Sequence, residues 1–308
     1  MGGIIYGEIK KTGSQISMNE NSTPLKIICF GMGAIGTYIG GSLAAAGCEL
    51  TFVEPPGHFT DGQSATLKVH KIGGECLSPK VNIAIDVVNT LKRSHFDLAL
   101  IAVKAFDTKQ LVEILLPVAE YCPPILCLQN GVENEAEFES GIPNGNVIGA
   151  SITTAIRRLG LGEVQVEKLR GIAIENNSKF TQSIVDLFNK AGLRAKGYPD
   201  RIRMKWSKLL TNLQVNATSA ILNWSPSQVL KDPITYQIEV KQLKEALAVM
   251  KKMGVRVVDL PGTPVRLLIQ ALANIPVSFG RTIIGLPLSK ARGGKCLPCR
   301  STLRQEDP

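Results

Sequence analysis

The sequence predicts an α/β protein in which a parallel sheet carries helices on both faces and is followed by an all-helical region. Two observations predict this fold. Up to about residue 200, short apolar runs alternate with helical stretches, which is typical of a doubly wound parallel sheet. Beyond residue 200 the pattern is helical only. The 308 residues suffice for two packed domains, so we expect an extension over residues 1–25, an α/β domain over 26–199 and a helical domain over 200–308.

The α/β domain is expected to begin with one complete strand–helix–strand unit. Its parts are an apolar run over 26–30, a glycine-rich turn at 31–36, a small-residue helix over 37–46 and a strand over 49–53. Further buried strands are expected over residues 67–69, 98–103, 125–128 and 147–151. Helical stretches are expected over 108–121 and 181–191. Alternating residues over 162–175 predict a hairpin that closes the domain.

The second domain is expected to consist of helices over residues 201–223, 235–253 and 264–274.

Apolar runs in the whole chain are too short for a membrane span, and the N-terminus lacks the pattern of a secretory signal. We therefore expect a cytoplasmic protein without membrane contact. The seven cysteines are scattered and odd in number, which favours reduced thiols. The Cys296-Leu-Pro-Cys299 pair has neither a second pair nor a nearby histidine, so no metal site is expected.

The charge is unevenly distributed between the halves of the chain. The net charge is +9, but the first 150 residues carry 10 Lys+Arg and 15 Asp+Glu, whereas the remainder carries 25 and 11. A basic region is compatible with nucleic acid, a membrane surface or a small anionic ligand. The basic cluster of the tail contains no interleaved aromatic residue and no nucleic-acid motif, which argues against nucleic acid; it comprises Lys290, Arg292, Lys295, Arg300 and Arg304.

The glycine-rich turn matches the dinucleotide-binding fingerprint of Rossmann-type domains. Its residues are Gly31, Met32, Gly33, Ala34, Ile35 and Gly36, and they connect a predicted strand to a predicted helix. The first glycine permits the tight turn, the second lets the backbone approach a pyrophosphate, and the third lets the helix pack closely on the strand. The helix N-terminus adds unpaired N–H groups and a favourable dipole. A nicotinamide dinucleotide is therefore the expected cofactor.

The residue at the end of the second strand indicates which nicotinamide cofactor is bound. Glu54 follows Gly36 by 18 positions, close to the usual offset of the acidic residue that binds the ribose diol of NAD. A carboxylate there would repel the 2′-phosphate of NADP, so NAD is favoured. NADP remains open, because Glu54 could face solvent and Lys68 or Lys71 could reach the phosphate instead.

Three polar residues recur at intervals of four in the first helix of the second domain. On a continuous helix over 201–223, Lys208, Asn212 and Asn216 would form one polar stripe surrounded by apolar residues. Asparagine is a mediocre helix former, so two of them among core residues indicate a polar face that lines a cleft. The alternative is an ordinary solvated helix face.

Four motifs in order resemble one family, the ketopantoate reductases, also called 2-dehydropantoate 2-reductases. They are Gly31-Met-Gly-Ala-Ile-Gly36, Val103-Lys104-Ala105, Gln129-Asn130-Gly131-Val132-Glu133 and the segment from Trp206 to Asn216. The late Arg292-Gly-Gly-Lys295 also resembles the segment before the family's C-terminal active-site loop, so the resemblance extends from about residue 26 to about residue 295.

This resemblance implies a role for individual residues. It implies that Lys208 is the catalytic lysine, that Asn212 and Asn216 bind substrate, and that Asn130 contacts both cofactor and substrate. It also implies that Lys104 and the backbone of Ala155 contact the cofactor. The activity it implies is reduction of 2-dehydropantoate, or a related branched 2-keto acid, by NAD(P)H, with Lys208 as proton donor. The basic second half suits such an anionic substrate. Family members include monomers and homodimers.

Two departures from the family pattern bear on function. The Glu54-Pro-Pro56 run stands where the family usually has an arginine, which sets its NADP preference against the NAD expectation. The family also continues past the Arg292–Lys295 region into a loop and further helices, whereas this chain ends at Pro308. The second hypothesis is therefore a truncated relative that binds dinucleotide without turnover, because an open cleft would weaken electrostatic catalysis.

Overall fold

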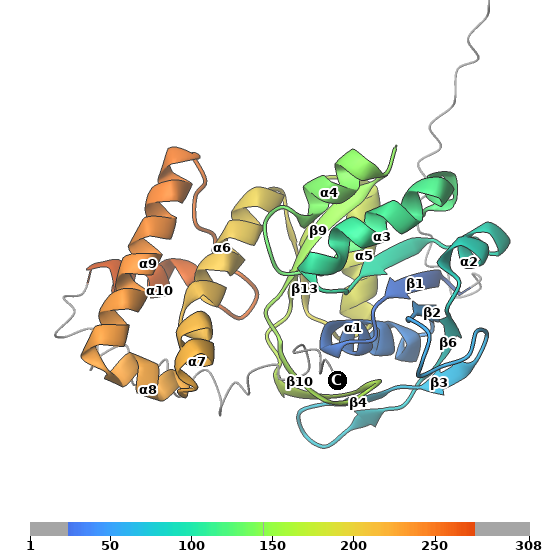
Figure 1. Cartoon of the computed structure of the whole chain (residues 1–308), viewed down its shortest axis with the longest axis horizontal. Helices are drawn as coiled ribbons and strands as arrows, with labels where there is room; N and C mark the ends of the chain where they lie inside the picture. Colours follow the sequence, from blue (N-terminus) through green and yellow to red (C-terminus); the bar gives the residue numbers. More distant parts are fainter. Residues whose placement is uncertain (1–23, 144, 275–308) are drawn as a thin grey trace, which may run out of the picture.

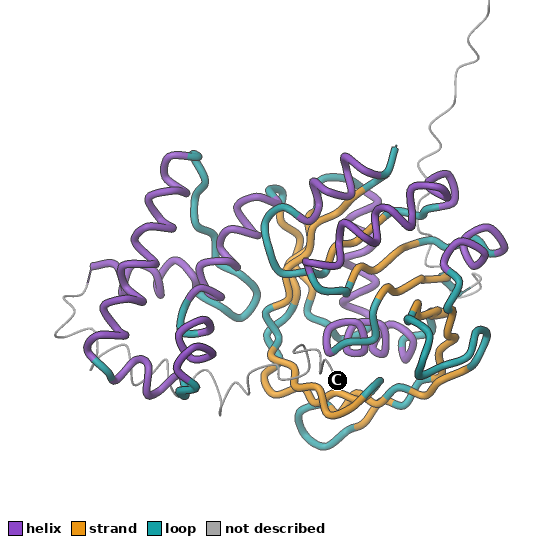
Figure 2. Tube along the Cα trace, in the orientation of Figure 1, coloured by secondary structure: helices purple, strands orange, loops and turns teal. Residues whose placement is uncertain are grey.

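The computed structural model describes residues 24–143 and 145–274, in two sheets and a group of helices (Figures 1 and 2). The larger sheet has nine strands in the order β13-β12-β9-β8-β7-β1-β2-β6-β3. Its six central strands, β9 to β6 in this order, are parallel to one another, as the sequence predicts. Their bounds are β1 Lys26–Phe30, β2 Glu49–Val53, β6 Lys80–Ala84, β7 Leu98–Ile101, β8 Ile125–Cys127 and β9 Val147–Ile152. The expected doubly wound α/β fold is confirmed.

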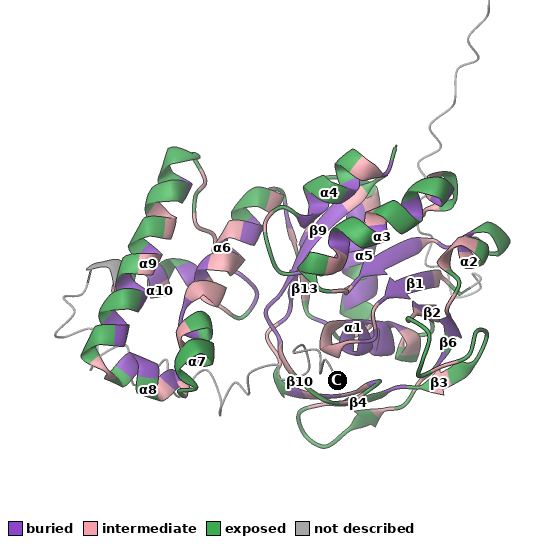
Figure 3. Cartoon of the chain, viewed as in Figure 1, coloured by how far each residue is buried: buried purple, intermediate pink, exposed green. Residues whose placement is uncertain are grey.

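Helices cover both faces of this sheet because its strands are apolar on both sides. On one face, α1 (Ala34–Ala45) and α5 (Lys179–Lys190) pack with the second sheet. On the other face lie three helices, α2 (Val87–Arg93), α3 (Thr108–Leu115) and α4 (Asn134–Gly141). Figure 3 shows the central strands buried between these layers.

The edges of the sheet correct one prediction. Residues 162–175 do not form a hairpin, because β11 (Glu163–Lys168) and β12 (Ile172–Glu175) belong to different sheets. Strand β11 pairs with β10 (Ala155–Gly160) and β4 (Lys68–His70) in a four-stranded sheet that ends with β5 (Cys76–Leu77). Strand β12 runs antiparallel to β9 and parallel to β13 (Ala195–Tyr198). The remaining edge strand is β3 (Ser64–Thr66).

The alternation of apolar residues in β11 is real, but its partner cannot be read from local sequence. Val164 and Val166 face the core beneath α1, and the strand finds its partners in β10 and in the distant β4. The helix expected over 108–121 also differs: it ends at Leu115 and continues as 3₁₀ turns over Leu116–Tyr121. Pro117 lies at the start of these turns and has no N–H to continue the α-helical hydrogen bonds.

The helical region lies beside the β13 edge of the sheet (Figure 1). Its helices are α6 (Arg201–Leu213), α7 (Asn216–Leu222), α8 (Pro226–Lys231), α9 (Pro233–Lys252) and α10 (Val265–Asn274). Buried residues of α6, α9 and α10 form one apolar cluster, which also takes in Ala173 and Tyr198 of the sheet. No described helix has both the length and the apolar character needed to cross a bilayer.

The helix predicted over 201–223 is wrong as a single element. It breaks between α6 and α7, where Val215 has the left-handed backbone angles φ 56° and ψ −11°. A β-branched residue rarely adopts this conformation, so tertiary contacts must hold it there.

The expectations for residues 1–23 and for the tail beyond residue 274, including the Cys296–Cys299 pair and the Arg292–Lys295 motif, lie outside the described residues.

Candidate active site

The predicted cofactor residues follow the carboxyl ends of four neighbouring strands. In the order β8-β7-β1-β2, these strands are followed by Asn130, Lys104, Gly31 and Glu54. The chain leaves β1 toward β2 and later returns to its other side as β7, so the strand order reverses at β1. Ligands of open α/β sheets bind in the crevice outside the carboxyl ends of the strands, at such a switch point. The fold therefore gathers these residues where a dinucleotide would lie.

The three glycines of the turn have different surroundings. Gly31 has φ +99°, and a Cβ there would lie 3.1 Å from the backbone nitrogen of Val103. A Cβ on Gly36 would lie 1.9 Å from the carbonyl oxygen of Gly31, so the helix packs directly on the turn. A Cβ on Gly33 would meet nothing within 4 Å. The turn is thus tight on its protein side and open above Gly33, as the approach of a pyrophosphate requires.

Helix α1 begins at this open position without a side-chain cap. Its N-cap is Gly33, which offers no side-chain oxygen to the first N–H groups of the helix, and Ala34 and Ile35 begin the helix half-buried against the core. The side chain of Met32, the second residue of the turn, is buried in the apolar core. The N–H groups of the first turn, together with the helix dipole, fit an anionic pyrophosphate. The residues present therefore fit a dinucleotide.

Glu54 lies against the glycine turn and not in open solvent. Its carboxylate accepts a hydrogen bond from the backbone N–H of Met32. Burial raises the pKa of Glu54, while the Met32 N–H and the nearby Arg158 and His58 act in the opposite direction. The carboxylate thus ends at the turn, where the ribose of a dinucleotide bound in this mode would lie.

Helix α6 brings the predicted catalytic residues to the loop after β8. The side-chain amide of Asn212 donates a hydrogen bond to Oδ1 of Asn130, over 3.3 Å. Lys208 lies one turn before Asn212 on the same helix and is half-buried. Residues four apart on a helix lie on one face, so the amine of Lys208 shares the side of α6 that meets Asn130. Asn130 and Asn212, which belong to separate sequence motifs, are therefore in direct contact.

The remaining predicted site residues lie on other elements of the fold. Lys104 is exposed directly after β7, and Ala155 is the half-buried first residue of β10. Asn216 is exposed and is the first residue of α7, so it does not continue the stripe formed by Lys208 and Asn212. The predicted three-residue stripe therefore ends at Asn212, because α6 stops at Leu213.

A buried carboxylate holds the helix break. Glu239 of α9 is 6% exposed and accepts hydrogen bonds from the backbone N–H of Val215 at 2.6 Å and the hydroxyl of Thr218 at 2.5 Å. The Val215 N–H has no carbonyl partner once the helix is broken, so Glu239 supplies the acceptor. This contact explains why Val215 stays in a left-handed conformation and where α7, with Asn216, begins.

We expect the Glu239→Ala variant to be destabilised by about 2–3 kcal/mol, because it leaves a buried N–H without an acceptor. Denaturant unfolding followed by circular dichroism measures this difference. Gln237→Ala, at an exposed position of the same helix, is the matched control and should change stability by less than about 0.5 kcal/mol. A Glu239→Ala variant as stable as this control would mean that Val215 does not depend on the carboxylate.

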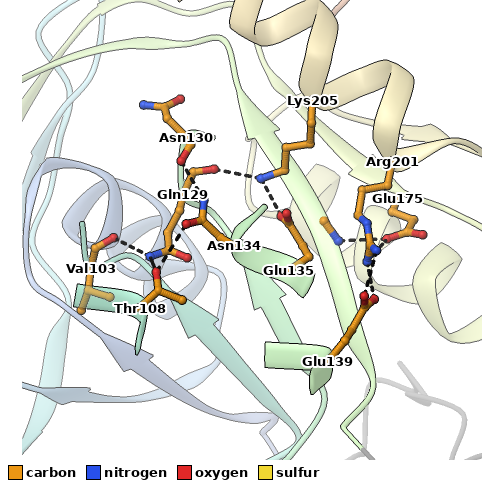
Figure 4. A network of polar contacts seen from close by, with 11 residues as sticks. Val103, Thr108, Gln129, Asn130, Asn134, Glu135, Glu139, Glu175, Arg201 and Lys205 are labelled. Carbon is orange, nitrogen blue, oxygen red and sulfur yellow. Dashed lines mark hydrogen bonds and ion pairs between the residues drawn. The ribbon is translucent and has the colours of Figure 1, made fainter. Parts of the chain in front are cut away.

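Several polar residues around the site are not evident from the sequence. Lys205 and Glu135 form an ion pair of 2.6 Å whose side chains are each 2% exposed, and Gln129 and Thr108 are buried beside it (Figure 4). Lys205 stands among Arg201 and Arg203, and Glu135 stands in an acidic run, so both look like surface charges in the sequence. Gln129 is the exception, because it belongs to the motif that contains Asn130.

Comparisons with known proteins match both regions of the chain. The model of the ketopantoate reductase PanE/ApbA family matches residues 27–179, and that of the family's C-terminal region matches residues 200–275. A 2-dehydropantoate 2-reductase of Nostoc sp. is 27% identical over 251 residues, which cover 79% of this chain and 76% of the relative.

Solved structures share the fold. The crystal structure of a PanE/ApbA family ketopantoate reductase from Ralstonia eutropha superposes with a TM-score of 0.68 at 27% identity, covering 81% of this chain and 80% of that chain. D-mandelate dehydrogenase, solved with NADH and anilino(oxo)acetate, has a TM-score of 0.64 at 18% identity, covers 81% of this chain and 79% of that chain, and so shares the fold alone. From the two family matches and these relatives, the chain belongs to the ketopantoate reductase PanE/ApbA family, a family of NAD(P)H-dependent oxidoreductases.

Proposed function

We propose that the protein reduces 2-dehydropantoate, or a related branched 2-keto acid, to the corresponding 2-hydroxy acid with a nicotinamide cofactor. The observation that carries this proposal is the hydrogen bond between Asn130, after β8, and Asn212, on α6. It joins the loop after β8, at the carboxyl end of the parallel strands, to the helix that bears Lys208. A substrate held there would lie between a cofactor on the glycine turn and the amine of Lys208.

The roles of the side chains follow from their chemistry. When bound, the reduced cofactor supplies a hydride to the keto carbon. The Nζ of Lys208 donates a proton to the oxygen that becomes negatively charged, and its positive charge stabilises that oxygen beforehand. The amides of Asn130 and Asn212 offer donors and acceptors to the carboxylate and hydroxyl of the substrate without adding charge. A substrate contact of Asn216, at the start of α7, rests on the family resemblance alone.

We assign the cofactor to an α/β domain over residues 26–199 and the proton donor to a helical domain over 200–308. Strand β13 ends at Tyr198 and α6 begins at Arg201, which supports a boundary near residue 200.

The positive charge of the second half favours a small anionic substrate over a neutral one. The expected assembly is a monomer or a homodimer.

We further propose that NADH is preferred over NADPH. The carboxylate of Glu54 lies against the glycine turn, where it can accept hydrogen bonds from a ribose diol and would repel a 2′-phosphate. Burial raises the pKa of Glu54, so on acidification it becomes protonated at a higher pH than an ordinary glutamate. Because the diol needs the ionised form as acceptor, the affinity for NADH should begin to fall at that higher pH.

The Glu54→Gln variant is expected to shift the preference toward NADPH. Removal of the charge weakens the bond to the diol and ends the repulsion of the phosphate, so the ratio of kcat/KM for NADH to that for NADPH should fall at least about tenfold, or about 1.4 kcal/mol. Steady-state kinetics with each cofactor measure this ratio. Glu49→Gln, at the exposed start of the same strand, should leave it unchanged. An unaltered ratio in Glu54→Gln would remove Glu54 from cofactor choice.

The proposed activity is tested by a panel of 2-keto acids with NADH and NADPH on the purified chain. We expect consumption of reduced cofactor with a branched 2-keto acid, 2-dehydropantoate included. Calorimetric binding of NADH without turnover of any keto acid would support the second hypothesis, a dinucleotide-binding protein without reductase activity.

A further inference from the structure

A buried lysine joins α6 to the loop that carries Asn130. The Nζ of Lys205 donates a hydrogen bond to the backbone carbonyl of Gln129 at 2.9 Å and forms the 2.6 Å ion pair with Glu135 of α4. Figure 4 shows the amine pointing from α6 between these two partners. Gln129 immediately precedes Asn130, so the contact ends one residue from the candidate site.

The side chain of Gln129 bonds to the neighbouring loop and to α3. Its Nε2 donates to the hydroxyl of Thr108 at 2.9 Å and lies 3.2 Å from the carbonyl oxygen of Val103 and 3.3 Å from that of Lys104 (Figure 4). One residue therefore connects the loop after β7, which carries Lys104, to the loop after β8.

Asn134 fixes the loop after β8 from its far side. Its Nδ2 donates to the carbonyl oxygen of Asn130 at 2.8 Å, and its Oδ1 accepts from the hydroxyl of Thr108 at 3.4 Å. The two loops are thus held to each other by buried and part-buried hydrogen bonds, and in the network drawn in Figure 4 Lys205 extends them to α6. The exposed bond between Asn212 and Asn130 is a second link to the same helix.

The position of Lys205 on α6 determines what this contact fixes. Lys205 precedes Lys208 by three residues, which is about 4.5 Å along the helix and about 60° around it. Holding the amine of Lys205 against Gln129 therefore sets both the height and the rotation of the helix that presents Lys208.

Stability alone does not account for two charges at this place. A buried ion pair is often no more stabilising than well-packed apolar residues of the same size, because both charges lose their hydration. Such pairs are best attested where they fix one arrangement among several. The contact between α6 and the loop after β8 affects the relative position of Lys208 and Asn130. Small displacements of reacting groups lower the rate of a reaction strongly.

We propose that Lys205 is a positioning residue for the reaction: its buried ammonium fixes α6 against Gln129 and Glu135, and thereby sets the separation of Lys208 from Asn130. The proposal rests on the proposed reductase function, in which the keto acid is held between these two residues. In the proposed reaction, Lys205 itself touches neither substrate nor cofactor.

The test uses the double variant Lys205→Met with Glu135→Leu, which replaces both charges by apolar side chains of similar size. We expect its melting temperature to stay within about 3 °C of the unmodified protein and its Kd for the cofactor to change less than about twofold. Its kcat for the keto acid should fall about 10–100-fold, since the reacting groups are misplaced. Arg203→Met, an exposed position of the same helix, should leave kcat unchanged.

A double variant with kcat within threefold of the unmodified protein would overturn the proposal, whatever its melting temperature. If the double variant does not fold, Lys205→Arg serves instead, because it keeps a buried cation beside Glu135 while its larger, planar head group is expected to change the distance between α6 and the Gln129 carbonyl. The same kcat limits apply to it.

Hydrogen–deuterium exchange separates this proposal from the proposed function. If the unmodified protein reduces no keto acid, the function fails, and the exchange of peptides covering residues 129–135 and 201–213 decides about Lys205. Exchange at least tenfold faster in the variant at both segments, and unchanged in α1, would support the fixing role. Unchanged exchange at both segments would overturn it.

Discussion

Replacing Lys208 by alanine is expected to lower kcat for the keto acid by about 10²–10⁴-fold, the usual effect of losing a general acid. The residue shares one face of α6 with Asn212, whose amide contacts Asn130 over 3.3 Å, and we propose that its amine lies at the keto oxygen of a bound substrate. The Kd for the reduced cofactor should change little, because in the proposed reaction Lys208 acts on the substrate oxygen. Stopped-flow kinetics with a fluorescence titration of cofactor measures both quantities.

Lys241→Ala is the matched control, since it removes an exposed lysine from α9 and the same amount of positive charge from the helical region. We expect it to keep kcat within about twofold. If Lys208→Ala retained full turnover, another group would have to protonate the alkoxide, and the assignment of α6 as the catalytic helix would be wrong.

Two alanine substitutions in the glycine turn should have different consequences. Gly33→Ala adds a Cβ where no atom lies within 4 Å, so folding should be affected by less than about 1 kcal/mol. The same Cβ occupies the space that a pyrophosphate needs, and the Kd for the cofactor should rise at least about tenfold, which is about 1.4 kcal/mol. Calorimetric titration and thermal unfolding measure the two effects.

Gly36→Ala should impair both properties. Its Cβ would lie 1.9 Å from the carbonyl oxygen of Gly31, so the turn or the helix must move, at a cost of about 2–3 kcal/mol. Unchanged cofactor affinity in the stable Gly33→Ala variant would show that the dinucleotide does not approach the backbone at this turn.

The strands next to the site were predictable because each signal is local. Lys26–Phe30 and Glu49–Val53 are short apolar runs bounded by glycines or charged residues, and the structure gives them the predicted bounds. Gly31, Gly33 and Gly36 were recognisable because each has a separate steric requirement at a fixed spacing. The family resemblance implied that Asn130 and Asn212 both bind substrate, but their direct contact came only from the structure, since 82 residues separate them.

The features that the sequence did not reveal depend on distant partners. Nothing near Val215 signals a helix break, because its cause is Glu239 on another helix. The strand partners of β11 include β4, almost a hundred residues away. Lys205 has the sequence context of a surface charge, and only the approach of α4 and the loop after β8 buries it. Tertiary contacts decided these points, and local propensity could not.

Transfer of deuterium from the cofactor to the product decides whether the protein is a 2-keto acid reductase. Reduced cofactor carrying deuterium at both C4 positions of the nicotinamide is incubated with the protein and 2-dehydropantoate, and the product is analysed by mass spectrometry. We expect the unmodified protein to form a 2-hydroxy acid with one deuterium at C2, and the Lys208→Ala variant to form it much more slowly. Oxidation of the cofactor without deuterium in the product, or no product at all, would contradict this expectation.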